Sequence, residues 1–254
     1  MGGAINTNST LGSSNFDGSK QTVVKANASA GFSIISYTGD GSSGATTGHG
    51  LGVAPKIMFH KDRDSTNAWY TITTAVDGSP DYLYLNTTAA KADSGVTAPT
   101  SSLVYFTASS ESNHNGRDYI MYAFSEVEGY SKIGSYEGNQ NADGPFVFLG
   151  FTPAWIMIKN ADNSSSRQWC IIDATRTTFN KSASAEVLFA NEEQTESAAV
   201  NSYGQFASKP AVDILSNGFK VREGETAANT QTNRSNTHIF LAFAESPFKN
   251  ARAK

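Results

Sequence analysis

An internal repeat constrains the fold of this chain more than any other sequence feature. Four short blocks occur twice, in the same order. The first copy contains Gly31-Phe32-Ser33, Leu51-Gly52-Val53-Ala54-Pro55, Trp69-Tyr70-Thr71-Ile72 and Ile120-Met121-Tyr122-Ala123-Phe124-Ser125-Glu126. The second contains Gly129-Tyr130-Ser131, Leu149-Gly150-Phe151-Thr152-Pro153, Trp169-Cys170-Ile171-Ile172 and Ile239-Phe240-Leu241-Ala242-Phe243-Ala244-Glu245. Blocks repeated in register predict two tandem copies of one structural unit.

The positions of these blocks set the expected domain boundaries. We expect the first unit over residues 31–126 and the second, with a C-terminal tail, over residues 127–254. Residues 1–30 are rich in Gly, Ser, Asn and Thr, and we expect a polar arm that attaches to a partner and is ordered only on binding. The second copy is longer mainly between Asn191 and Lys209, where we expect an extended surface loop.

The apolar segments of both copies predict β-strands. They are about four to six residues long, rich in aromatic and β-branched residues, and bounded by turn formers. Examples are Ile57-Met58-Phe59, Tyr82-Leu83-Tyr84-Leu85, Phe146-Val147-Phe148-Leu149 and Trp155-Ile156-Met157-Ile158. Asn217-Gly218 predicts a hairpin with a type I′ turn. Charged residues make up only 17% of the chain, which disfavours long solvated helices. We therefore predict an all-β fold of two tandem, homologous β-sandwich units behind a short polar N-terminal arm.

The sequence contains no recognisable catalytic motif. Cys170 is the only cysteine and is expected to be a small buried apolar residue. The four histidines are far apart, and we align His238 with Asp118 of the first copy. We predict that the protein is not an enzyme and has no cofactor. The net charge of −4 gives no reason to expect nucleic acid, and no apolar run approaches the roughly 20 residues that cross a bilayer.

Two sets of residues are candidates for binding. Asp62, Asp64 and Asn67 supply oxygen atoms within one loop and are calcium candidates, with an ordinary polar turn as the alternative. The tryptophans Trp69, Trp155 and Trp169 are candidates for stacking on sugar rings. The alternative is that Trp69 and Trp169 belong to the core, because both recur in the repeat.

Three stretches of the chain resemble one known family. They are Gly48-His49-Gly50-Leu51-Gly52-Val53-Ala54-Pro55-Lys56, the region from Val127 through Val147, and Ala242-Phe243-Ala244-Glu245-Ser246-Pro247-Phe248-Lys249. They are similar to the duplicated C-terminal module of tail-fibre-like and virion structural proteins of bacteriophages that infect marine bacteria and cyanobacteria. The resemblance covers residues 27–254.

The resemblance implies a structural protein exposed on the bacteriophage particle, of the tail fibre, tail tip or adaptor type, that contacts host surface glycans. The alternatives are a capsid decoration or cement protein and a carbohydrate-binding module. The implied partners are other virion proteins, bound through the N-terminal arm, and host surface polysaccharide. We expect a homo-oligomer, with a trimer favoured, located in the virion after assembly in the host cytoplasm.

Overall fold

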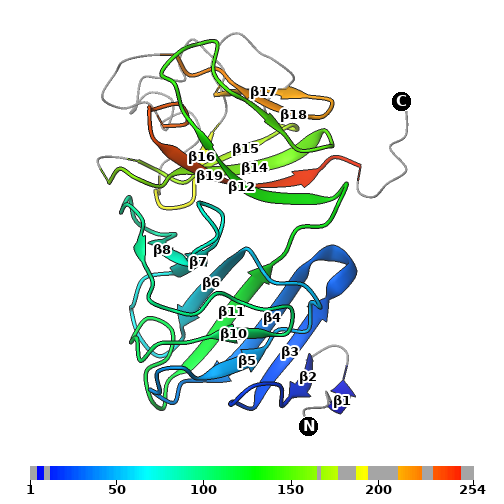
Figure 1. Cartoon of the computed structure of the whole chain (residues 1–254), viewed down its shortest axis with the longest axis vertical. Helices are drawn as coiled ribbons and strands as arrows, with labels where there is room; N and C mark the ends of the chain where they lie inside the picture. The colour runs from blue at the N-terminus through cyan, green and yellow to red at the C-terminus, as the bar shows by residue number, and fades with distance from the viewer. Residues whose placement is uncertain are drawn as a thin grey trace. The chain divides into compact units, whose positions relative to one another are not determined.

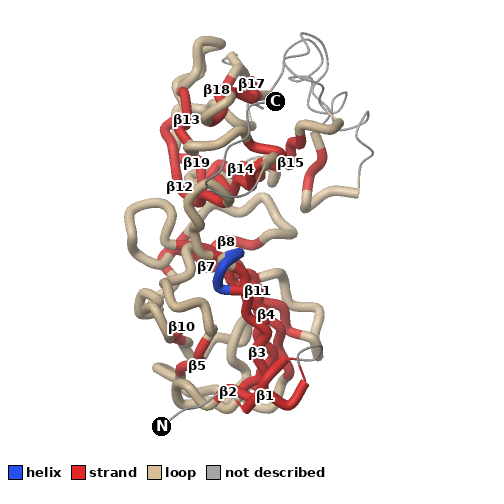
Figure 2. Tube along the Cα trace, turned by 90° about the vertical axis from the view of Figure 1, so that its right-hand side faces the viewer, coloured by secondary structure: helices blue, strands red, loops and turns tan. Residues whose placement is uncertain are grey.

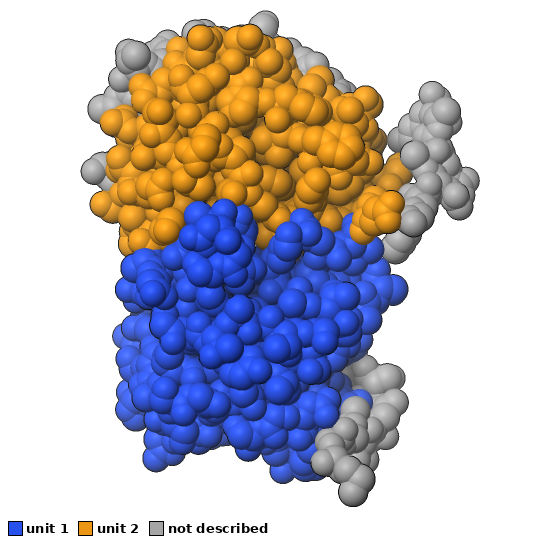
Figure 3. Space-filling model, in the orientation of Figure 1, with its two compact units in different colours: residues 1–85, 92–127 blue, residues 86–91, 128–254 orange. Residues whose placement is uncertain are grey.

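The computed structural model describes residues 5–8, 12–164, 167–176, 187–193, 211–224 and 231–246. Within these residues all regular structure is β-strand apart from one 3-10 turn, Ala28–Ala30, which confirms the all-β prediction (Figure 1). The chain divides into two compact units (Figure 3). Unit 1 comprises residues 1–85 and 92–127, and unit 2 comprises residues 86–91 and 128–254. None of the helical structure described is long and apolar enough to cross a membrane.

Unit 1 is built from a large and a small antiparallel sheet. The large sheet has the strand order β1-β2-β3-β4-β11-β6-β7-β8-β9, and the small sheet pairs β10 with β5. The strands are β1 (Ile5–Asn8), β2 (Gly12–Asn15), β3 (Thr22–Asn27), β4 (Phe32–Thr38), β5 (Thr46–Gly48), β6 (Ile57–Asp62), β7 (Tyr70–Thr73), β8 (Asp81–Tyr84), β9 (Ala92–Asp93), β10 (Leu103–Tyr105) and β11 (Asp118–Phe124).

Unit 2 also consists of two antiparallel sheets. The larger has the order β12-β19-β14-β15-β16, and the smaller has the order β13-β18-β17 (Figure 2). The strands are β12 (Ser131–Glu137), β13 (Phe146–Phe148), β14 (Pro153–Asn160), β15 (Cys170–Asp173), β16 (Leu188–Phe189), β17 (Val212–Leu215), β18 (Gly218–Val221) and β19 (Thr237–Ala244).

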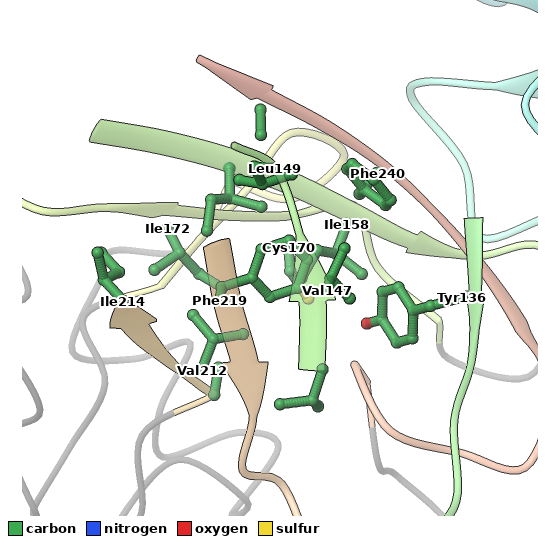
Figure 4. Close-up of a cluster of buried hydrophobic side chains, with 14 of the residues drawn as sticks. Tyr136, Val147, Leu149, Ile158, Cys170, Ile172, Val212, Ile214, Phe219 and Phe240 are labelled. Atoms are coloured by element: carbon green, nitrogen blue, oxygen red, sulfur yellow. The ribbon is translucent and has the colours of Figure 1, made fainter. Parts of the chain in front are cut away.

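Each unit has a hydrophobic core that joins its two sheets, as in a β-sandwich. In unit 1, Ile35 and Met121 of the large sheet share a cluster with Val104 of the small one. In unit 2, Ile158 and Phe240 of the larger sheet meet Val147, Ile214 and Phe219 of the smaller (Figure 4). Cys170 is fully buried in this second cluster, as predicted.

The two units have the same order of strands in their large sheets. The order β4-β11-β6-β7-β8 of unit 1 corresponds to β12-β19-β14-β15-β16 of unit 2. The two tryptophan blocks also correspond, because the Leu85 N–H donates to the Trp69 carbonyl and the Ala190 N–H to the Trp169 carbonyl. This is the arrangement that a tandem repeat requires. Descent of both units from one ancestor stays a prediction.

Strand register corrects the alignment of His238. Tyr119 lies opposite Tyr37 in unit 1, and His238 lies opposite Tyr136 in unit 2. Since Tyr37 and Tyr136 occupy the same place in β4 and β12, His238 corresponds to Tyr119 and not to Asp118. Both pairs of rings are stacked, with centroids 5.3 Å apart for Tyr37–Tyr119 and 5.0 Å apart for Tyr136–His238.

The predicted separate arm at residues 1–30 is wrong for the described part of this segment, while its attachment to a partner stays a prediction. β2 and β3 belong to the large sheet of unit 1, where β3 pairs with β4. The inward side chains Thr22 and Val24 are buried, while Val23 between them is 43% exposed. The polar composition hid this alternation, which is the signature of a half-buried strand.

Residues 86–91 form a second difference from the prediction, because they lie inside the expected first unit but belong to unit 2.

The predicted hairpin at residues 213–222 forms, but with a different turn. β17 and β18 pair with Leu215 opposite Gly218, so Ser216-Asn217 makes the turn. Positive φ angles occur at neither Asn217 nor Gly218, so the type I′ assignment is wrong. Gly218 is required for another reason: a Cβ atom there would collide with the carbonyl oxygen of Val147 on β13.

Of the predicted surface loop between Asn191 and Lys209, residues 194–209 lie outside the described residues.

Burial predicts very different costs for two phenylalanines of one sheet. Phe219 is 0% exposed and Phe148 is 56% exposed. We expect Phe219→Ala to lower the free energy of unfolding by about 3–5 kcal/mol, because it leaves a cavity in the core. Phe148→Ala is the control and should change it by less than about 1 kcal/mol. Chemical denaturation measures both, and equal losses would contradict the assigned core.

Candidate binding surface

A buried asparagine organises the loops at one end of unit 1. Asn113 is 0% exposed. Its side-chain oxygen accepts a hydrogen bond from the Asp40 N–H (3.1 Å), and its side-chain nitrogen donates to the carbonyls of Ser42 (2.9 Å) and Thr107 (3.3 Å). Its own carbonyl accepts from the Gly41 N–H (2.9 Å). One side chain therefore fixes two loops that approach from different strands.

Asn233 repeats this arrangement in unit 2. It is also 0% exposed, and its side-chain oxygen accepts from the Asn139 N–H (2.9 Å). Its side-chain nitrogen donates to the carbonyls of Asn141 (2.7 Å) and Glu223 (2.8 Å), and its carbonyl accepts from the Gln140 N–H (2.8 Å). Gln140 has φ of 56°, at the place where unit 1 has Gly41 with φ of 68°.

Each buried asparagine follows a residue whose carbonyl holds a core tyrosine. Tyr37 donates its hydroxyl proton to the Ser112 carbonyl (2.7 Å), and Tyr136 donates to the Thr232 carbonyl (2.6 Å). Ser112-Asn113 and Thr232-Asn233 are thus a fifth repeated element. Two residues of common polar types give little signal in a sequence, so this element could not be predicted from the repeat blocks. Its place shortly before the closing strand of each copy is the signal that was available.

The calcium candidates Asp62, Asp64 and Asn67 lie in a polar turn, and the positive charge inside this turn is the ammonium group of Lys61. The carboxylate of Asp62 accepts from the Asp64 N–H (3.0 Å), Ser65 Oγ (2.8 Å), Asn67 Nδ2 (3.2 Å) and Arg117 (3.0 Å). Burial alone would raise the pKa of Asp62, but these hydrogen bonds and the Arg117 charge outweigh it and lower the pKa.

Lys61 completes this turn. Its ammonium donates to the carbonyls of Asp62 (2.8 Å), Ser65 (3.1 Å) and Asn67 (2.7 Å), as a bound cation would. Asp64 is directed elsewhere, because its carboxylate accepts from the Asp118 N–H (2.6 Å). The residues that the structure describes include no group of three His, Cys, Asp or Glu placed to hold a metal ion. The calcium interpretation is therefore replaced by the polar turn.

Lys159 occupies the corresponding place in unit 2. Its ammonium donates to the carbonyls of Asn160 (2.7 Å) and Thr88 (3.3 Å). The side chain is 0% exposed, and burial lowers its pKa to about 7. Because the side chain is buried, a substrate cannot reach this amine in this conformation.

The structure separates the three tryptophans. Trp169 is 1% exposed, so its use as a stacking surface is wrong and its assignment to the core is correct. Trp69 and Trp155 are both partly exposed, so the assignment of Trp69 to the core is wrong. Trp69 stacks on Tyr122 of unit 1, with ring centroids 6.3 Å apart, and Trp155 packs against Phe243 of unit 2 at 5.7 Å. Each of these two can present an aromatic surface to a ligand.

Among the described residues, the most exposed aromatic side chains lie on β13 of unit 2. Phe146 is 45% exposed and Phe148 is 56% exposed, while Val147 between them points into the core (Figure 4). Among the described strands, β13 lies at the edge of its sheet and pairs only with β18. On the β18 side, the Pro145 carbonyl accepts from the Val221 N–H and the Leu149 N–H donates to the Asn217 carbonyl. Because ladder bonds alternate, the N–H and C=O groups of Phe146 and Phe148 point away from β18.

Lys132 supplies a positive charge at this edge. Its ammonium donates to the Phe148 carbonyl (3.0 Å) and lies 5.2 Å from the centroid of the Phe148 ring. We call Phe146, Phe148 and Lys132 the β13 edge. It combines outward backbone groups that no other described strand pairs with, two exposed rings and a cation, which suits binding of an extended chain or another edge strand.

The corresponding edge of unit 1 is covered by the chain itself. The Gly48 N–H donates to the Asp17 carbonyl (2.8 Å), and the N–H groups of Ser19 and Lys20 donate to the Thr46 carbonyl (3.1 Å each). Gly48 makes this close approach possible, since a Cβ atom there would lie 2.7 Å from Asp17 Cβ. Phe148 stands at the same place in unit 2.

Comparison with known proteins gives one family match. The profile of a family described as "Domain of unknown function (DUF7483)" matches residues 6–247. No curated protein matches the chain, and no solved structure matches it.

Asn113 and Asn233 should contribute similar amounts to the free energy of unfolding. We expect Asn113→Ala and Asn233→Ala each to lower the free energy of unfolding by about 2–4 kcal/mol, because buried N–H and C=O groups lose their partners. Asn115→Ala, at an exposed position of the same loop, is the control and should stay within about 0.5 kcal/mol of the parent. Chemical denaturation measures all three. A loss no larger than the control's would contradict the role of either asparagine.

Buried histidines predict instability in mild acid. Burial lowers the pKa of three histidines below the value of 6.5 that they have in the unfolded chain. The pKa of His60 falls to about 3, the pKa of His238 falls to about 4, and the pKa of His49 is also lowered. The folded state therefore disfavours the proton: this contribution to stability is complete above pH 6.5 and decreases as the pH falls toward 4. Melting temperatures measured between pH 7.5 and 4 should decrease, and less steeply for His60→Gln. Replacement of the exposed His114 by Gln is the control, and a flat profile for the parent would contradict this origin.

Proposed function

This chain belongs to the DUF7483 family, and we propose that it is a structural protein of a bacteriophage particle, exposed on the particle surface as part of a tail fibre, tail tip or adaptor. The observation that carries the proposal is the β13 edge. Its aromatic rings and backbone groups are held on a rigid strand at the surface, which suits contact with another macromolecule.

Two further features support this role. The repeated blocks resemble the duplicated module of phage tail-fibre-like and virion proteins. The loops that Asn113 and Asn233 contact are held by these fully buried side chains, which lowers the ordering cost of a contact made through them. We further propose that the protein is not catalytic.

Mass spectrometry of purified virions tests the proposal. We expect peptides of this protein in particles of the phage that encodes it. A few copies per particle would indicate the tail, and hundreds of copies would indicate capsid decoration instead. Absence from purified particles would contradict a structural role in the virion.

A carbohydrate-binding role is the second candidate, favoured by the partly exposed Trp69. Its stacking on Tyr122 fixes the ring orientation, which is what stacking on a sugar requires. We expect binding to a host surface polysaccharide that weakens at least about tenfold in Trp69→Ala, a loss of about 1.4 kcal/mol. Phe16→Ala, which removes an exposed aromatic ring elsewhere in unit 1, is the control and should bind as the parent does.

A glycan array and titration calorimetry measure this binding. No binding to any host polysaccharide would contradict the carbohydrate-binding role. Release of oligosaccharides during the incubation would instead show a depolymerase and contradict the proposal that the protein is not catalytic.

A further inference from the structure

We propose that the β13 edge is an interface between two copies of this chain, in which β13 of one copy pairs antiparallel with β13 of the other about Val147. The pairing joins the small sheet of each unit 2 into one continuous sheet. It goes beyond the proposed function, because it names the occupant of the edge and the geometry of the contact.

The backbone of β13 is complementary to itself. Phe146 and Phe148 direct their N–H and C=O groups away from β18, and none of these groups bonds to another described residue except the Phe148 carbonyl, which accepts from Lys132. An antiparallel pairing centred on Val147 sets Phe146 of one copy opposite Phe148 of the other. Residues that are opposite and directed toward each other exchange both backbone hydrogen bonds. A carbonyl accepts two hydrogen bonds, so Lys132 can keep its contact.

The side chains of β13 are complementary as well. The sequence Phe146-Val147-Phe148 reads the same in both directions, so the two-fold pairing places phenylalanine beside phenylalanine twice. Both residues point to the outer face of the sheet, where they are 45% and 56% exposed. Cross-strand aromatic pairs stabilise antiparallel sheets, by about 0.2–1 kcal/mol per pair. Pairing would therefore bury the largest exposed apolar surface of this strand.

Charge contributes little to this pairing. Lys132 lies at the C-terminal end of β13, beside Phe148. Asp143 precedes the N-terminal end, where its carboxylate already pairs with Lys220 (2.6 Å) and lies 4.0 Å from Arg222. An antiparallel pairing brings Lys132 of each copy near this end of its partner, so the backbone and the phenylalanine rings carry the contact.

Because the edge of unit 1 is covered, the proposed contact stops at two copies. β5 corresponds to β13, but residues 17–20 already occupy its outward backbone groups. The contact therefore joins unit 2 to unit 2, and one two-fold axis completes it without propagation into a fibre. The short strand buries much less than the roughly 800 Å² per partner of a stable dimer, so the pair should form only at high protein concentration. Copies crowded on a particle would meet this condition.

Sedimentation equilibrium over a wide range of protein concentration tests the pairing. We expect the average mass of the full chain to rise from that of a monomer toward that of a dimer. The double variant Phe146→Ser/Phe148→Ser should stay monomeric at every concentration. The control Phe16→Ser/Val53→Ser removes two other exposed apolar side chains, both in unit 1, and should still dimerise. A parent that stays monomeric, or a double variant that dimerises as the parent does, would overturn the proposal.

Cysteine crosslinking tests the register. A chain with Phe146→Cys mixed with a chain with Phe148→Cys should form a disulfide-linked dimer on mild oxidation, because these positions lie opposite each other. Either variant alone should crosslink much less, since like positions are diagonal and too far apart for a relaxed disulfide. Equal crosslinking in all three samples would overturn the stated register. Failure of the pairing leaves the virion proposal standing, and absence from virions leaves the pairing standing.

Discussion

Pairing of the closing strand along both of its edges is the interaction on which each unit depends. β11 lies between β4 and β6, and β19 lies between β12 and β14. Each closing strand is the last of its unit in the sequence but lies inside the large sheet, so it joins the opening strand to the middle of the copy. Such pairings are distant in sequence, and folding must close long loops before they form. The large sheet of a unit is therefore complete only when the opening, middle and closing strands of that copy are all in place.

The sequence was informative where structure follows from short-range patterns. The apolar runs at residues 57–59, 146–149 and 155–158 overlap β6, β13 and β14, because strand length and composition are local properties. Thr22 and Val24 escaped notice since only two inward side chains mark that strand. Asn113 and Lys61 could not be assigned, because their partners come from loops whose positions are set by the fold. The Asn-Gly signal located a hairpin but not its turn, since Gly218 serves the close approach of β13 instead.

The polar turns show how this protein uses charge inside its loops. Lys61 binds three carbonyl oxygens and Lys159 binds two, so an ammonium group takes the place that a metal ion would hold in a calcium-stabilised loop. In unit 1 the carboxylate of Asp62 and the guanidinium of Arg117 accompany the ammonium, and in unit 2 Asn160 replaces the aspartate. These two loops are therefore closed by hydrogen bonds from lysine ammonium groups of the chain itself.

The difference between the two edges follows from the way the units are joined. In unit 1, residues 17–20 reach β5 because a segment long enough to form β2 and β3 precedes β4. In unit 2 only six residues separate the end of β11 at Phe124 from the start of β12 at Ser131, too few to supply a similar cover. The residues at the two edges are consistent with this difference. Gly48 lets the backbone at Asp17 approach β5 closely, whereas the side chain of Phe148 would block such an approach and is an exposed aromatic surface instead. Among the described residues, the short joint between the units therefore supplies no segment that covers the β13 edge as residues 17–20 cover β5.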